Sequence, residues 1–155
     1  MNANESQIQA MLYQYLPLYE HIGMTVESAR DGIYRCRLPL DARNSNHFNT
    51  VHAALQWATA EALGGLLLVD TFGKDCFAKQ FVAVKSAAID FLRPARTAIT
   101  AEAIADPQEL QRIKALVDAG QEAQFSLGVT ILSADGETVA RMSANYVARP
   151  KRAAV

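Results

Sequence analysis

The sequence has few of the residues that hold metals or disulfide frameworks, and no excess of charge of one sign. Its two cysteines, Cys36 and Cys76, have neither the spacing of metal ligands nor a CxxC pattern, so we expect no metal site. With 15 basic and 16 acidic residues, the net charge of −1 does not favour nucleic acid or a membrane as a partner. Free thiols without a secretory signal pattern favour a cytoplasmic location.

Internal repeats, low-complexity tracts and linker-like segments are also absent from the sequence. A chain of 155 residues is large enough to bury a core without covalent staples, so we predict a single domain over residues 1–155. Half of the residues are hydrophobic and 20% are charged, which is the composition of an ordinary globular protein.

The longest apolar run, residues 51–69, approaches the length that spans a bilayer, about 20 residues. It contains His52, Gln56 and Glu61, and no basic cluster flanks it. Because an ionised carboxylate is unfavourable in the middle of a membrane, we interpret the run as a buried central helix. Gly64-Gly65 supports this interpretation, since glycine destabilises a helix by about 1 kcal/mol relative to alanine unless close packing requires it.

Strands surround this helix in pairs. Asp31-Gly32 and Asp135-Gly136 are typical hairpin turns, which predicts a largely antiparallel sheet. One very apolar helix must be buried on all sides, so we expect an α+β fold whose sheet curves around the helix while a second subunit covers the rest. The other predicted elements are a first helix capped by Asn4 or Ser6 and ended by Pro17, two strands within 24–40, strands at 81–92, 98–105, 123–133 and 138–148, and a short helix within 106–120.

The short helix has clear end signals. Asp106 is a natural N-cap, Glu109 would complete a capping box, and Gly120 would stop the helix. The strand that follows the long apolar helix, 81–92, is apolar on both faces, so we expect it to be covered on both sides, with Lys85 as a buried charge. The aromatic residues that we expect in the core are Trp57, Phe91 and Tyr146.

The polar residues of the central helix cannot all meet within one chain. Glu61 follows His52 by nine residues, which places it half a turn away and about 13 Å further along the helix. Two antiparallel copies of the helix could bring the two residues together. The spacing therefore hints at a site that two subunits share.

A motif runs through the same segment. From Asn46 to Glu61 the chain reads N-x-x-x-T-x-H-A-A-x-x-x-x-x-x-E, which resembles the signature of the hotdog-fold acyl-CoA thioesterases, in particular their PaaI-like branch. "IDFLRPAR", residues 89–96, is similar to the strand that follows the helix in that family. The resemblance implies a hotdog fold, a homodimer or homotetramer with sites at the dimer interface, and hydrolysis of thioesters of coenzyme A or of an acyl carrier. It implies no cofactor other than the coenzyme A of the substrate.

By position, the resemblance makes Glu61 the general base or nucleophile and Asn46 the residue that positions water or the acyl group. His52 and the N–H of Ala53 then form the helix start where the thioester oxygen is polarised. Such N–H groups lack partners within the helix, and oxyanion donors are often worth about 3 kcal/mol in the transition state. The residues expected to bind substrate are Thr50, Ala53, Ala54, Gln56, Arg93 and Arg96. Arginine suits the phosphates of coenzyme A, and Gln56 would either position water or bond between helices.

Departures from the motif leave other interpretations open. Ala53-Ala54 replaces the usual Gly-Gly, and the acid is Glu rather than the more common Asp. A buried ion pair between Glu61 and Lys85 would remove the base and leave a non-catalytic acyl-CoA-binding pocket. His47 precedes Glu61 by fourteen residues, the spacing of the hotdog 3-hydroxyacyl thioester dehydratases, but the prolines of that signature are missing.

Overall fold

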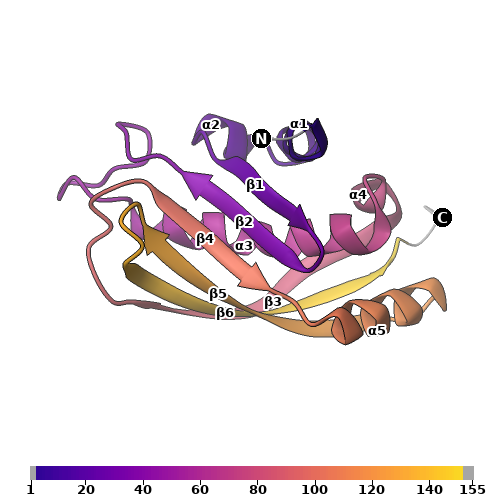
Figure 1. Cartoon of the computed structure of the whole chain (residues 1–155). Helices are drawn as coiled ribbons and strands as arrows, with labels where there is room; N and C mark the ends of the chain where they lie inside the picture. The colour runs from indigo at the N-terminus through magenta and orange to yellow at the C-terminus, as the bar shows by residue number, and fades with distance from the viewer. Residues whose placement is uncertain (1–2, 152–155) are drawn as a thin grey trace.

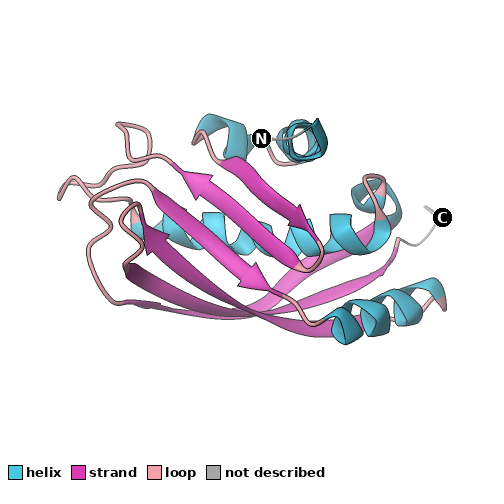
Figure 2. Ribbon diagram, in the orientation of Figure 1, coloured by secondary structure: helices cyan, strands magenta, loops and turns pink. Residues whose placement is uncertain are grey.

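The structure, a computed structural model, describes residues 3–151. One antiparallel sheet of six strands, in the order β1-β2-β4-β5-β6-β3, curves around the long helix α3 (Figure 1, Figure 2). The elements are α1 (Ala3–Tyr15), α2 (Pro17–His21), β1 (Thr25–Arg30), β2 (Ile33–Leu38), α3 (Ala53–Phe72), α4 (Cys76–Lys79), β3 (Gln80–Phe91), β4 (Ile99–Ile104), α5 (Pro107–Asp118), β5 (Ala123–Ser133) and β6 (Thr138–Pro150). The predicted α+β fold, with its sheet wrapped around a central helix, is confirmed.

The core lies between α3 and the inner face of the sheet. α3 contacts all six strands, and its leucines from Leu63 to Leu68 are fully buried. Gly64 allows this close packing, because an added Cβ there would overlap the ring of Tyr146 on β6. The prediction of close helix packing from Gly64-Gly65 is therefore confirmed. No helix within residues 3–151 is long and apolar enough to cross a membrane.

The predicted hairpins and the alternation of buried and exposed residues are also confirmed. β1 and β2 join through Asp31 and Gly32, both at positive φ, and every second residue of β2 is buried. β5 and β6 pair through a turn that contains Gly136 at φ +83°. Both cysteines are free and buried.

Strand β3 differs from the prediction. Among residues 3–151 it pairs with β6 alone, so its other edge has no neighbouring strand there, and its residues are all at least partly exposed. Lys85 lies at a β-bulge and is exposed rather than buried. Trp57 and Phe91, predicted for the core, are 38% and 48% exposed, whereas Tyr146 is buried. These expectations were wrong because they assume cover that a single chain does not provide.

Helix ends were predicted only in part. Asp106 caps α5 as expected, since its Oδ1 accepts the N–H of Gln108 at 2.8 Å. Glu109 does not complete a capping box but accepts hydrogen bonds from Arg112. Asn4 and Ser6 lie inside α1, whose first described residue is Ala3. The four-residue helix α4 was missed, because so short a segment has no detectable helical period.

Candidate active site

Glu61 lies on α3 at the wall of a cavity of about 300 Å³. The hydroxyl of Tyr19, on α2, donates a hydrogen bond to Oε2 of Glu61 at 2.8 Å. The hydroxyl of Tyr146 donates to the main-chain oxygen of Glu61 at 3.1 Å. The partner of this carboxylate is therefore a neutral tyrosine, and the alternative interpretation, an ion pair with Lys85, is not found.

The surroundings of Glu61 make its carboxylate a stronger base than an exposed one. Burial raises the pKa of Glu61, and the hydrogen bond from Tyr19 opposes this rise without cancelling it. Burial and the nearby charge of Glu61 raise the pKa of both Tyr19 and Tyr146 well above that of a free phenol. The two tyrosines thus stay protonated as donors, while the raised pKa makes Glu61 a stronger general base than an exposed carboxylate.

Apolar and aromatic side chains form most of the wall of the Glu61 cavity. They come from α1, α2, α3, α4, β6 and the first residues of β3. Gly65 and Phe77 lie next to each other in this wall, since a Cβ on Gly65 would lie 3.3 Å from Cζ of Phe77. The cavity is suited to an apolar group next to a carboxylate.

Asn46 organises the loop before α3. Its Nδ2 donates to Oγ1 of Thr50 at 2.9 Å, and its Oδ1 accepts the N–H groups of Phe48 and Thr50 at 2.9 and 3.2 Å. The side chain that was predicted to position water or substrate therefore also folds the loop that leads into the helix.

His52 caps α3. Its Nδ1 accepts the N–H of Ala54 at 3.1 Å, so this nitrogen carries no proton in the structure. The N–H of Ala53 is not taken by this cap. Residues 52–54 are exposed in the chain. The helix start thus presents at Ala53 a donor of the kind that binds a developing oxyanion.

A second cavity, of about 570 Å³, brings most of the predicted binding residues together. Its wall includes Asn46, Thr50, Ala53, Gln56, Arg93 and Arg96. Glu61 does not belong to it, and the Glu61 cavity contains none of these residues. A single chain therefore holds two separate cavities, one with the carboxylate and one with the helix start.

The polar side chains of the second cavity differ in whether they already have an ion pair or a hydrogen bond within the chain. Arg93 already pairs with Glu137, its Nε lying 3.2 Å from Oε1. Arg96 is exposed and forms no ion pair among residues 3–151. Gln56 is buried and donates to the main-chain oxygen of Val51 at 3.0 Å, so in the single chain it bonds to the loop rather than to another helix.

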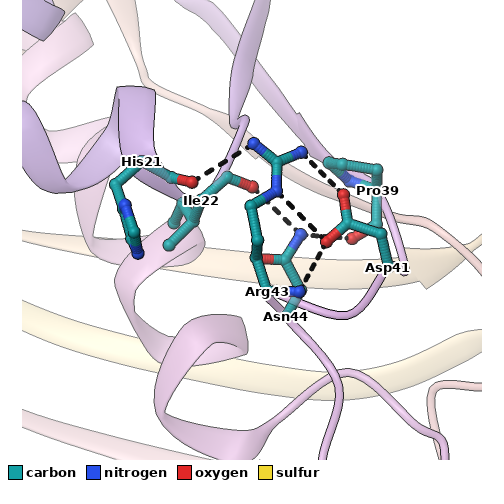
Figure 3. Close-up of polar contacts among 6 residues, drawn as sticks. All are labelled: His21, Ile22, Pro39, Asp41, Arg43 and Asn44. Carbon is teal, nitrogen blue, oxygen red and sulfur yellow. Dashed lines mark hydrogen bonds and ion pairs between the residues drawn. The ribbon is translucent and has the colours of Figure 1, made fainter.

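Asn44 has a role that the sequence did not reveal. Its side-chain Nδ2 donates to the main-chain oxygens of Ile22 and Pro39 at 3.0 and 2.8 Å (Figure 3). Its main-chain oxygen accepts the N–H of His52 at 2.8 Å. This fully buried residue joins α2, the end of β2 and the start of α3. The only available signal was an asparagine in a polar loop, which is too common to single out.

Similarity to solved structures identifies the class of fold. A protein of unknown function from Pseudomonas aeruginosa, described as a probable thioesterase, is 25% identical with a TM-score of 0.80, over 94% of this chain and 95% of that one. A protein of unknown function from Chlorobaculum tepidum is 16% identical with a TM-score of 0.82, over 95% and 94%. A thioesterase from Haemophilus influenzae is 13% identical with a TM-score of 0.72, over 97% and 93%. The fold is thus the hotdog fold of thioesterase-type proteins.

The sequence narrows this class to one family. Residues 4–147 match DUF4442, a domain of unknown function, and the chain belongs to that family. No protein of curated function matches the sequence.

Proposed function

We propose that the protein hydrolyses thioesters of coenzyme A or of an acyl carrier, at a site that two copies of the chain build together. The observation that carries this proposal is the division of the site residues between two cavities. Glu61 adjoins the first residues of β3, and the helix start of α3 adjoins the residues that follow β3.

Through the free edge of β3, the two cavities would act as the half-sites of one active site. An unpaired strand edge is a template for pairing with another strand. If β3 pairs antiparallel with β3 of a second copy about a two-fold axis, the beginning of one strand lies beside the end of the other. The Glu61 cavity of each copy then adjoins the second cavity of the other copy. In this arrangement Glu61 of one copy meets His52 of the other, although the two residues lie far apart along a single helix.

Exposed apolar side chains support the same pairing. Phe81 lies near the start of β3, Phe91 ends the strand and Leu92 follows it, and all three are at least 38% exposed. Trp57, on α3, is 38% exposed. Aromatic side chains of this kind are enriched at subunit interfaces, where a second copy would cover them.

The chemistry follows from the assembled groups. Glu61 of one copy takes a proton from water, and the resulting hydroxide attacks the thioester carbonyl. The N–H of Ala53 from the other copy stabilises the oxyanion. When the intermediate collapses, the carbon–sulfur bond breaks and the thiolate takes up the proton held by Glu61, which yields an acid and a thiol. The apolar wall around Glu61 suits the acyl group, and Arg96 suits a phosphate of coenzyme A.

The dehydratase alternative receives less support. It requires His47 as a second catalytic group, and this residue is exposed in the loop, with its ring tilted against that of Phe48 at 3.8 Å between ring centroids. His47 borders neither cavity.

Release of free thiol from short, medium, long and aromatic acyl-CoAs tests the proposal. We expect hydrolysis of at least one class, its loss in Glu61→Gln, and retained binding of the acyl-CoA by that variant. Asp70→Asn is the matched control, because Asp70 lies nine residues further along α3 and also binds a tyrosine. No hydrolysis of any substrate, or a Glu61→Gln variant as active as the wild type, would contradict the proposal; binding without turnover would identify a binding protein.

A further inference from the structure

We propose that Tyr19 is a positioning residue that fixes the Glu61 carboxylate for reaction, so that the N-terminal helices form part of the active site. This inference rests on the proposed function. Tyr19 binds one carboxylate oxygen, Oε2. The other oxygen, Oε1, has no hydrogen-bond partner among residues 3–151 and is left for water or substrate. A flexible side chain is thereby held by one atom while the second stays available.

Tyr19 is itself held rigidly. Its side chain is 4% exposed, and its main-chain oxygen accepts the N–H of Met24 at 3.0 Å. The end of α2 is tied down in turn, since Asn44 donates to the main-chain oxygen of Ile22. A rigid donor fixes the carboxylate better than a mobile one, because less freedom remains to be lost in the transition state.

The other groups around Glu61 do not replace this contact. Tyr146 reaches the main-chain oxygen of Glu61 rather than its carboxylate. Lys151 borders the same cavity, but its Nζ donates to the main-chain oxygen of Phe77 at 2.8 Å. Tyr15, from α1, borders the cavity without a hydrogen bond to Glu61. Within the described chain, Tyr19 is the donor that touches the carboxylate.

The same helix offers a matched control. Tyr34, which is fully buried, donates to Oδ2 of Asp70 at 2.9 Å. This pair repeats the tyrosine–carboxylate contact nine residues further along α3, and neither residue borders the two half-sites. Loss of either hydroxyl removes one partly buried hydrogen bond to a carboxylate, so the stability losses should be comparable.

The test compares Tyr19→Phe with Tyr34→Phe in steady-state hydrolysis across pH. We expect Tyr19→Phe to lower kcat roughly tenfold, with KM little changed, because a hydrogen bond to a charged group is lost while the cavity keeps its shape. Since this bond favours the ionised carboxylate, its loss should also move the acidic limb of the kcat profile to higher pH. Tyr34→Phe should change neither kcat nor the pH of the acidic limb.

The inference is overturned if Tyr19→Phe keeps the wild-type kcat and pH profile, or if Tyr34→Phe alters both equally; hydrolysis by the wild type would still uphold the proposed function. If the wild type hydrolyses no thioester, the proposed function fails. The inference then fails with it, because it concerns the reaction. Where hydrolysis is found, carbon-13 titration of the Glu61 carboxyl checks the contact itself: a pKa that rises in Tyr19→Phe supports the inference, and an unchanged pKa overturns it.

Discussion

The main-chain oxygen of Asn44 accepts the N–H of His52, and the Asn44 side chain meanwhile binds α2 and the end of β2. One buried residue thus sets where α3 begins. Since the N–H groups at that point are the proposed oxyanion donors, the position of the helix start matters for chemistry as well as for folding.

Replacement of Asn44 should therefore destabilise the fold. Asn44→Ala leaves the main-chain oxygens of Ile22 and Pro39 without a donor, and we expect a loss of about 3 kcal/mol in the free energy of unfolding. Urea unfolding measures this loss. The neighbouring Asp41–Arg43 pair in Figure 3 is exposed, so Arg43→Ala should change stability little. Equal effects of the two substitutions would contradict the role given to Asn44.

The N–H of Ala53 can be removed without removing the helix. Ala53 is the first residue of α3, where proline is tolerated, and His52 before it has φ −58° and ψ 136°, values that suit a residue preceding proline. Ala53→Pro should lower kcat by a factor of about 10²–10³, as expected for loss of an oxyanion donor. Circular dichroism checks that the helix persists. Ala54→Pro is not a substitute, because the N–H of Ala54 binds His52.

The wall around Glu61 should set the preferred acyl length. Gly65→Ala places a Cβ 3.3 Å from Phe77 and narrows the cavity, so the preference should move to shorter acyl chains. Phe77→Ala opens the same region and should move the preference to longer chains. Specificity constants over a series of straight-chain acyl-CoAs give the answer. Shifts in the same direction, or no shift, would place the acyl group elsewhere.

Glu61 should also lower stability at neutral pH. Burial raises its pKa in the folded protein above the unfolded value, so the folded state holds this proton more tightly. The resulting stabilisation is fully present below the unfolded pKa and is lost as the pH rises through the folded pKa. Glu61→Gln carries no charge and can still accept the hydrogen bond from Tyr19. Its Tm should exceed that of the wild type at neutral pH, and the gap should narrow as the pH falls.

The matching control for this measurement is Glu122→Gln, on an exposed side chain. It should not alter Tm at either pH. A Glu61→Gln variant with no gain in Tm at neutral pH would show that burial of Glu61 does not destabilise the folded protein.

Local signals in the sequence were sufficient for most of the fold. Hairpin turns such as Asp31-Gly32 and the capping residue Asp106 act over a few residues, so their effects can be recognised without knowing the tertiary structure. Gly64 indicated close packing because a helix rarely carries glycine without such a reason. Periodicity could not show that β3 lies at an edge, since an apolar strand looks the same whether its cover comes from its own chain or from another.

The site was harder to predict than the fold. The spacing of His52 and Glu61 showed that one helix could not unite them, and the two separate cavities agree with that geometry. The contact between Tyr19 and Glu61 joins residues 42 positions apart in the sequence. No local pattern marks such a pair. The alternative partner considered from the sequence, Lys85, was suggested by its opposite charge alone.

The central claim is that two copies share each site, and mixed dimers test it most directly. Glu61→Gln and Ala53→Pro should each be inactive or nearly so alone. A dimer with one of each has one site that lacks both groups and one site that retains both, so it should recover about half of the wild-type activity. Differently tagged chains allow the mixed dimer to be isolated and its thiol release measured. Recovery supports a shared site, whereas an isolated mixed dimer as inactive as its parents would contradict it.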